Sequence, residues 1–295
     1  MTLTGLASRL RPGEDHELIL RRLADTDWRT TQLDVTSPEH RDFAARATAG
    51  GAAIFYSFGN FCAIAAHPDA ESVVRVNLMK GRPADQVGSV TTTRDRIDAL
   101  FDWSALPDGL DRERVVALVD ELYERGPMGF RGPAARGVPD HLTSVDGGLR
   151  TTQIIAPGYR CPSNDLIAAV LDLTGEDYLF ITSANVSSTV TGNVEAAHYD
   201  LAGMQRDFGD RDGIVLIGHR DDAAIRATYP DHLPMSTSIL AFHKLAPGGA
   251  LTLERHGSLD AGIVRNVVAR HGFELVLGER AQNRLPLRDE AERAR

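Results

Sequence analysis

The stretch Leu179-Phe180-Ile181-Thr182-Ser183-Ala184-Asn185 places a polar turn directly after a short apolar run. A run of this kind is typical of a buried strand that ends at the edge of a sheet. The turn offers hydroxyl groups, an amide side chain and backbone N–H groups at the place where α/β proteins commonly bind ligands. The stretch therefore predicts a sheet with a polar binding edge.

A basic loop earlier in the chain complements this turn. Lys80-Gly81-Arg82-Pro83 follows a helix-like apolar run, and a lysine and an arginine two positions apart can reach phosphate oxygens from one extended loop. Together the two segments predict a nucleotide site. Taken singly, the Lys80 loop is better explained as a basic surface turn, and the Thr182 turn as a polar corner between a strand and a loop.

The composition describes ordinary globular material, long enough for one large domain or two modest ones. The chain has 295 residues, of which 42% are hydrophobic and 25% charged. Its net charge of -9 argues against a general affinity for nucleic acid, although a local basic cleft is compatible with it. Residues 1–12 show no signal-peptide pattern, and no apolar run approaches the roughly 20 residues of a membrane span. We therefore expect a cytoplasmic protein.

Cysteines and histidines give no sign of a disulfide framework or a metal site. Cys62 and Cys161 form no C-x-x-C pair, and we expect both to be buried free thiols. Ten histidines lack metal-ligand spacing, so surface or structural roles are expected for them, including His67, His219 and His256. The acidic segment at residues 210–213 lacks the closing glutamate of a calcium loop. The phosphate-loop, G-x-G-x-x-G, H-E-x-x-H and G-x-S-x-G motifs are all missing.

The hydrophobic pattern predicts alternating helices and strands, an α/β or α+β arrangement. The expected helices include a stripe of Leu18, Ile19 and Leu23 and the segments 38–48, 68–79, 112–124, 165–173 and 261–269. The expected strands are 52–55, 152–155, 179–181, 214–217 and 239–242. The segment 126–148, rich in Gly, Pro and Arg, predicts a long irregular loop, and the polar chain after Arg280 is expected to fray.

The ordered series of short polar segments resembles the YrdC family, the threonylcarbamoyl-adenylate synthases of tRNA modification. Relatives of that family form the carbamoyl-adenylate domains of hydrogenase-maturation and antibiotic O-carbamoylating proteins. The resemblance covers about residues 49–269 and rests on the joint order of its parts. These are Gly50-Gly51, Lys80 to Pro83, Gly126-Pro127, Arg160-Cys161-Pro162, Ser183-Ala184-Asn185 with Ser187, Asp210 to Asp212, Ser236-Thr237 and Arg255-His256-Gly257.

The resemblance implies a single YrdC-like domain of α/β (α+β) class, with a twisted mixed sheet, flanking helices and a concave cleft. It divides the chain into an N-terminal helical extension at 1–48, the YrdC-like domain at 49–270 and a C-terminal tail at 271–295. It also implies a nucleotidyltransferase that converts ATP, bicarbonate and an amino acid to a carbamoyl-type adenylate and pyrophosphate. Mg²⁺ would be bound with the ATP, and a tRNA-modification protein would be the partner.

By resemblance, one set of residues would bind the nucleotide: Lys80, Arg82, Asn185 and Arg255. A second set would contact the acyl substrate: Ser57, Arg160, Ser183 and Ser236. Converging cations would neutralise charge as an acyl oxygen attacks the α-phosphorus and pyrophosphate leaves. The resemblance assigns no catalytic acid or base and no protein ligand to a metal.

The amino-acid half of the family pattern is rewritten in this chain. The family segment P-T-D/E-T-V-Y-G-L corresponds to residues 56–63, where Ser57 and Phe61 are chemically similar counterparts. The second threonine of the family aligns with Gly59, its acidic residue with Phe58, and a substrate-contacting histidine with Thr91. A pocket that loses its polar partners discriminates against its former substrate. The acyl substrate is therefore open, and L-threonine is one candidate.

Three functions compete at this stage. The chain is an adenylate-forming synthase, a non-catalytic nucleotide- or RNA-binding module, or a structural or regulatory partner that keeps the pattern for its fold. Burying several cations in one cleft without an anion is costly, which favours the first two. The acidic overall charge weighs against an RNA role, and direct nucleic-acid binding is not expected.

Overall fold

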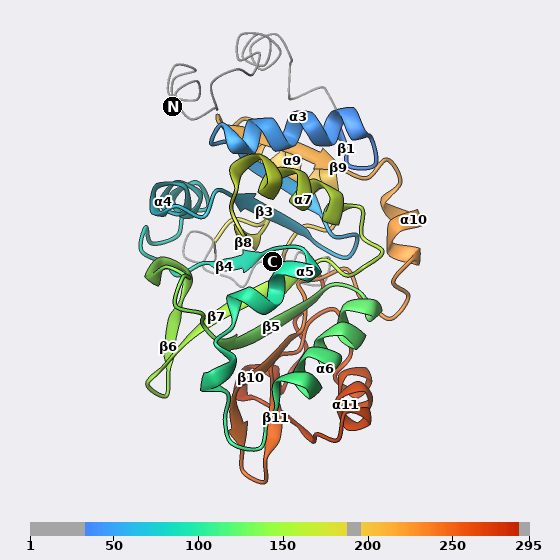
Figure 1. Cartoon of the computed structure of the whole chain (residues 1–295). Coiled ribbons are helices and arrows are strands. Elements are labelled where there is room, and N and C mark those ends of the chain that lie inside the picture. Colours follow the sequence, from blue (N-terminus) through green and yellow to red (C-terminus); the bar gives the residue numbers. More distant parts are fainter. Residues whose placement is uncertain (1–32, 188–195, 289–295) are drawn as a thin grey trace.

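A computed structural model describes residues 33–187 and 196–288, which form helices packed on both sides of a long mixed sheet (Figure 1). The helix expected at Leu18, Ile19 and Leu23 lies outside these residues. The helices are α3 Pro38–Ala49, α4 Ala70–Met79, α5 Arg94–Ile97, α6 Arg112–Arg125, α7 Ser163–Thr174, α9 Leu201–Phe208, α10 Asp222–Ala227 and α11 Ala261–Arg270. Short 3-10 turns are η1 Asp98–Leu100, η2 Trp103–Ala105, η3 Asp140–Leu142 and η4 Glu279–Ala281.

The strands within these residues form one twelve-stranded sheet in the order β1-β9-β2-β3-β8-β4-β7-β5-β10-β11-β12, with β6 paired beside β7. Their bounds are β1 Leu33–Asp34, β2 Ala53–Ser57, β3 Cys62–Ala66, β4 Ser89–Thr91, β5 Met128–Pro133, β6 Ser144–Asp146, β7 Leu149–Ala156, β8 Leu179–Ser183, β9 Ile214–Gly218, β10 Ile239–Ala246, β11 Ala250–Arg255 and β12 Leu275–Leu277. Parallel and antiparallel pairs are mixed along it. The predicted α/β class is therefore confirmed.

Local chemistry starts the helices where the sequence indicates. Ser37 caps α3 by accepting a hydrogen bond from the His40 amide, with Pro38 in the first turn. Asp69 caps α4 through the Ser72 amide at 2.9 Å. Asp111 caps α6 through the Arg114 amide at 2.9 Å. Each cap satisfies an N–H group that has no partner inside its helix.

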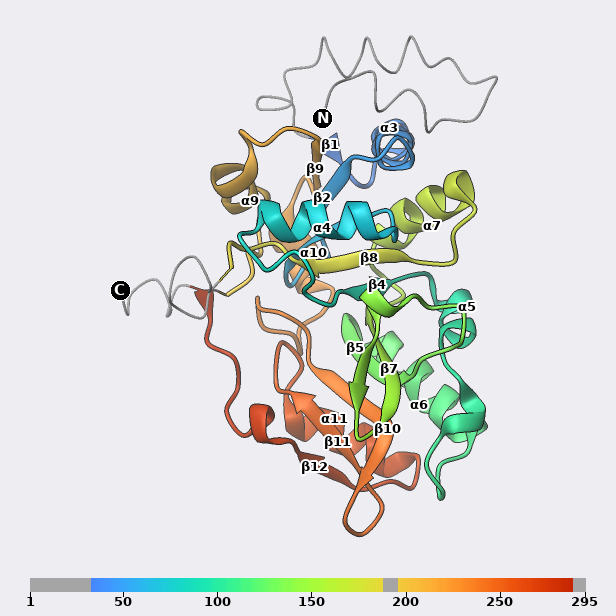
Figure 2. The ribbon, with the colours of Figure 1, turned by 90° about the vertical axis from the view of Figure 1, so that its left-hand side faces the viewer.

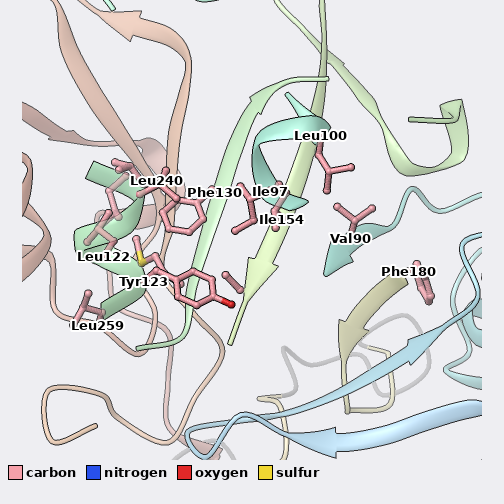
Figure 3. Packing of buried hydrophobic residues seen from close by; sticks show 14 of the residues in the cluster. Val90, Ile97, Leu100, Leu122, Tyr123, Phe130, Ile154, Phe180, Leu240 and Leu259 are labelled. Carbon is pink, nitrogen blue, oxygen red and sulfur yellow. The ribbon is translucent and has the colours of Figure 1, made fainter. Parts of the chain in front are cut away.

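The helices cover the two ends of the sheet differently. At the β9-β2-β3-β8 end, α3 and α7 pack together over one face, and α4 and α9 lie on the other. At the β7-β5-β10-β11 end, α6 and α11 cover one face. Phe130, Ile154 and Leu240 point from the strands into that core (Figure 3). Their alternating neighbours point to the other face, which is where the cleft described below lies.

Two expectations about irregular segments are wrong. The segment 126–148 is not one long loop, because it contains β5, η3 and β6. Glycine masks the strand pattern of β5: a side chain at Gly132 would meet the Phe242 and Phe101 rings, so only glycine fits there. The expected fraying after Arg280 is wrong for residues 281–288, where Arg284 donates to the Gly257 carbonyl at 2.9 Å; residues 289–295 lie outside the described part of the chain.

Both cysteines are buried free thiols, as expected. Burial raises the pKa of the Cys161 thiol to about 11, which keeps it protonated and unreactive near neutral pH. Within residues 33–187 and 196–288, none of the helices combines the length and apolarity needed to cross a membrane.

Candidate functional site

The two polar segments predicted to form a nucleotide site, residues 80–83 and 182–185, meet at the C-terminal end of α4. Lys80 forms the C-cap of that helix, and its fully buried side chain extends to the end of β8. Its Nζ donates to the Thr182 hydroxyl at 3.0 Å and to the Ser183 carbonyl. Arg82 donates from Nη1 to the same Thr182 hydroxyl at 2.6 Å. One threonine oxygen thus bridges two cationic side chains.

These two cations carry no compensating anion in the part of the chain that the structure describes. No carboxylate there forms an ion pair with Lys80 or Arg82. Burial, reinforced by the neighbouring Arg82 charge, holds the pKa of Lys80 well below its usual value. Burial also lowers the pKa of Arg82. An anion placed beside them would reverse these shifts, because it favours the charged forms.

Arg255 is a third cation in this region, at the end of β11. Its Nε donates to the Thr237 carbonyl at 2.7 Å and its Nη2 to the Thr237 hydroxyl at 2.9 Å. Burial lowers the pKa of Arg255 to about 10, so the guanidinium stays charged at neutral pH. The two bonds fix the plane of the guanidinium and leave its remaining N–H groups for other partners.

A cleft of about 410 Å³ brings several of these side chains together. Among the predicted site residues, Arg82, Ser183, Ser236 and Arg255 line it. Thr182, from the predicted polar turn, also lines it, and further polar residues in its lining were not predicted from the sequence: Gln86, Ser89, Arg131, Ser144, Thr151, Gln153 and Arg280. Among the residues that the structure describes, its lining includes four arginines and no carboxylate, so the cleft is strongly cationic.

The remaining predicted residues lie outside this lining. Lys80 and Asn185 are buried directly behind it, where Asn185 accepts a hydrogen bond from the Ser183 hydroxyl at 2.5 Å. The Ser57 hydroxyl is buried and accepts from the Gly59 amide at 2.9 Å. Arg160 lies exposed in the turn between β7 and α7. The structure therefore groups six predicted residues at or behind the cleft and does not bring Ser57 or Arg160 into its lining.

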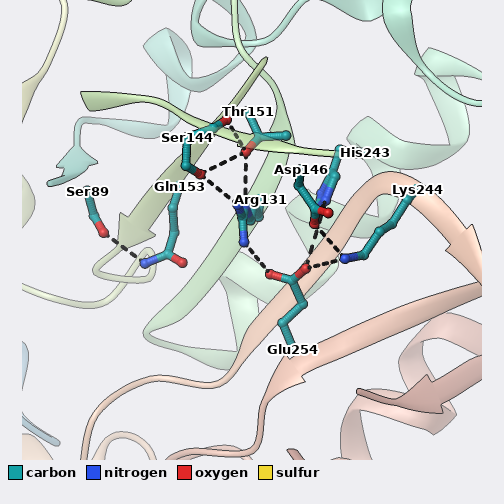
Figure 4. A network of polar contacts seen from close by, with 9 residues as sticks. All are labelled: Ser89, Arg131, Ser144, Asp146, Thr151, Gln153, His243, Lys244 and Glu254. Atoms are coloured by element: carbon teal, nitrogen blue, oxygen red, sulfur yellow. Dashed lines mark hydrogen bonds and ion pairs between the residues drawn. The ribbon is translucent and has the colours of Figure 1, made fainter. Parts of the chain in front are cut away.

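Arg131 on β5 is held by three neighbouring side chains (Figure 4). It donates from Nε to the Thr151 hydroxyl at 3.1 Å and from Nη2 to the Ser144 hydroxyl at 2.6 Å. It also pairs through Nη1 with Glu254 at 3.1 Å. Thr151, Thr152 and Ile154 are all buried, so the only sequence signal for Thr151 and Gln153 is that alternate residues of a strand face the same side of the sheet.

The cleft continues into a second hollow of about 520 Å³. Both share the side chains of Arg131, Gln153, Arg255 and Arg280. The second hollow also exposes Asp146, Lys244 and Glu254. The concave surface therefore has a purely cationic end and an end of mixed charge.

Asp146, His243 and Glu254 bring possible metal-ligand atoms within 4.8 Å of one another. Lys244 already supplies a cation to this group, with Nζ 2.5 Å from Asp146 and 3.3 Å from Glu254. Hydrogen bonds from Lys244 and His243 lower the pKa of Asp146 to about 2. Two carboxylates therefore face two cations, Lys244 and Arg131. The charges balance without a metal, and we interpret the group as a network that holds Arg131.

Comparison with known proteins places the fold. No protein-family model matches the chain, and no curated protein matches it by sequence. The solved structure of P. abyssi Sua5 complexed with L-threonine superposes with a TM-score of 0.59 at 16% identity, over 88% of this chain and 72% of that one. A double variant of P. abyssi Sua5 gives 0.58 at 17% identity, over 84% and 65%. The chain has the Sua5/YrdC fold.

The extent of these matches differs between relatives. The match to the Sua5 variant spans just under two thirds of that protein's length. A hypothetical protein from Streptococcus mutans is matched over 95% of its length and 82% of this chain, with a TM-score of 0.55 and 14% identity. At such identities the likeness concerns the fold. The chemistry has to be argued from the side chains in the cleft.

Proposed function

We propose that this chain is an ATP-dependent adenylate-forming synthase, which joins ATP, bicarbonate and an amino acid into a carbamoyl-type adenylate and releases pyrophosphate. The observation that carries the proposal is the fully buried Lys80 and the partly buried Arg82 on the Thr182 hydroxyl, with no carboxylate partner among the described residues. Buried charges are normally paired. A polyphosphate would supply the missing negative charge.

The proposed chemistry uses the cationic end of the cleft. Bicarbonate and the amino group of the substrate first condense to an N-carboxy amino acid with loss of water. An oxygen of that carbamate then attacks the α-phosphorus, and the bond from that phosphorus to the pyrophosphate oxygen breaks. Negative charge accumulates on the phosphate oxygens, which Lys80, Arg82 and Arg255 would stabilise. Ser183 and Ser236 would contact the junction between nucleotide and acyl group. Asn185, which bonds to Ser183, would hold that serine in place.

Mg²⁺ would come to the cleft on the phosphates of ATP. The cationic end has no carboxylate in its lining, and Asp146 and Glu254 at the other end already pair with Lys244 and Arg131. The described side chains therefore do not form a cage for this ion, which prefers oxygen ligands. Positioning and charge neutralisation by the protein would carry the reaction.

The substrate is proposed to differ from L-threonine. Phe58 and Phe61 pack edge to face at 5.1 Å, and Phe58 is fully buried. A side chain at Gly59 would clash with Ile225 of α10. The β2–β3 turn thus presents aromatic and backbone groups where the resemblance expects polar substrate contacts. Polar contacts at this site would have to come from elsewhere in the cleft.

Binding of a non-hydrolysable ATP analogue by calorimetry tests the nucleotide half of the proposal. We expect Arg82→Ala to weaken binding about tenfold or more, because a charge-assisted hydrogen bond contributes roughly 1.5–3 kcal/mol. Arg96→Ala is the matched control, since Arg96 pairs with Asp172 at 2.8 Å, and neither residue lines the cleft. Equal affinity in both variants would contradict the proposal.

A product assay then separates a synthase from a binding module. The protein is incubated with ATP, Mg²⁺, bicarbonate and each amino acid in turn, and adenylates and pyrophosphate are followed by mass spectrometry. An adenylate with one amino acid identifies the substrate. Nucleotide binding without any adenylate would instead favour the non-catalytic module. Threonylcarbamoyl-adenylate would show that the rewritten turn still accepts threonine.

A further inference from the structure

Arg131 occupies the junction between the two ends of the concave surface. It lines both the cationic cleft and the hollow of mixed charge. It projects from β5, whose neighbours β7 and β10 pair with it along its length. A side chain on the inner strands of a sheet is held more precisely than one on a loop. Arg131 is therefore placed as a fixed recognition group.

The hydrogen bonds of Arg131 fix its orientation and leave some of its N–H donors unused. A guanidinium has five N–H donors, and hydrogen bonds to Thr151, Ser144 and Glu254 occupy three of them. Each of the two terminal nitrogens therefore retains an N–H for a ligand. Two parallel donors of this kind match the two oxygens of a carboxylate.

The local charge also favours an anion at this junction. Glu254 and Asp146 are balanced by Arg131 and Lys244. Arg255 and Arg280 line the same hollow and have no ion-pair partner in residues 33–187 and 196–288. Glu279 also lines this hollow and offsets one of these two charges, so the junction keeps one net positive charge among the lining residues. Anions are attracted to such a surface.

We propose that Arg131 is the specificity-determining residue for the second substrate and binds a carboxylate group that does not react. This inference rests on the proposed function, in which the reacting acyl oxygen lies at the Lys80 and Arg82 end. The resemblance assigns Arg160 to contact with the acyl substrate, but Arg160 lies in an exposed turn outside the cleft lining. Arg131 supplies the guanidinium that this role requires.

The surroundings of Arg131 define the chemical class of the substrate. The hydroxyls of Ser89, Ser144 and Thr151 and the amide of Gln153 form a polar floor, in which Gln153 donates to Ser89 at 2.8 Å. The apolar part of the lining comes from Phe61, Val87, Leu142, Ile155 and Ile181. The substrate is therefore a small polar molecule with two anionic groups, one that reacts with the α-phosphorus and one that rests on Arg131.

The test measures binding of malonate, a minimal molecule with two carboxylates, to protein saturated with α,β-methylene-ATP. We expect malonate to bind, and malonamide, its neutral counterpart, to bind at least tenfold more weakly. Arg131→Gln should weaken malonate binding roughly tenfold to a hundredfold and leave the affinity for the nucleotide analogue unchanged. Arg150→Gln is the matched control, because Arg150 pairs with Asp140 at 3.2 Å outside the cleft lining.

Three results would overturn the inference: no malonate binding to the nucleotide-loaded protein, equal binding of malonate and malonamide, or equal malonate affinity in Arg131→Gln and the unmodified protein. A chain that does not bind the nucleotide analogue at all refutes the proposed function instead, which distinguishes the two failures. If Arg131→Gln does not fold, Arg131→Lys keeps the charge but loses the paired donors. That variant should weaken malonate binding about tenfold while its melting temperature stays within a few degrees.

Discussion

Lys80 shows how one residue can oppose stability while it prepares a binding site. Its ammonium is fully buried without a carboxylate partner in the described part of the chain. Replacing buried ionic groups with apolar ones of similar size often stabilises a protein, by about 1–4 kcal/mol. We predict that Lys80→Met raises the free energy of unfolding at pH 7 and lowers nucleotide affinity at least tenfold. Urea unfolding and calorimetry measure the two effects.

The stability difference between Lys80→Met and the unmodified protein should depend on pH. The pKa of Lys80 lies below its usual value in the folded chain, so the unfolded chain binds more protons between the two values. Stability from this group therefore rises with pH in that window, up to the ordinary lysine pKa near 10.5. The advantage of Lys80→Met should shrink between pH 7 and pH 10. A constant difference would contradict it.

At this scale the sequence could predict residues that act within short segments. Lys80 and Arg82 were predicted to share a site with the turn at Thr182, and the structure joins them through that threonine. Arg131 could not be found in this way. Its partners Ser144, Thr151 and Glu254 come from three strands, and only the register of the folded sheet brings them together.

At the scale of an element, strand β5 also depends on contacts that are distant in sequence, and substitution of its Gly132 tests how tightly it is packed. A Cβ atom at Gly132 would lie 2.3 Å from the Phe242 ring and 2.8 Å from Phe101, rings that pack edge to face at 4.9 Å. We predict that Gly132→Ala destabilises the protein by about 1–3 kcal/mol, because overpacking displaces these rings. Gly137→Ala is the control, since nothing lies within 4 Å of a Cβ there. Equal unfolding midpoints in urea would contradict the prediction.

Elements with a strong local signal were predicted well, and those that depend on tertiary packing were not. Helices α3, α4, α6, α7 and α11 have caps or apolar stripes that the sequence displays. Strand β5 has neither: it reads Met-Gly-Phe-Arg-Gly-Pro, and Gly and Pro suggest a loop. Its pairing with β7 and β10 and its aromatic neighbours make it a strand.

Within the described residues, the short strand β4 and the chain after β12 both connect the two ends of the sheet. Between the two ends of the sheet, the three-residue strand β4 pairs with β8 on one side and, through Val90 and Ile154, with β7 on the other. The chain after β12 then runs from the β12 end of the sheet toward the α4 and α9 end (Figure 2). Its Leu285 amide donates to the His256 carbonyl at 2.9 Å. Arg288 donates to the Ala196 carbonyl at 2.7 Å and lies 3.6 Å from Asp207.

This arrangement predicts that the C-terminal segment restrains opening of the cleft. Arg288→Ala removes the bond to Ala196 and the ion pair with Asp207, at a cost of roughly 1.5–3 kcal/mol for a charged donor. Hydrogen exchange should become faster at β4, well away from the substitution, as well as near Ala196, because local opening couples the two ends of the sheet. Exchange that changes only around residues 196–207 would show that the segment is a local tie and that β4 alone sets the geometry of the cleft.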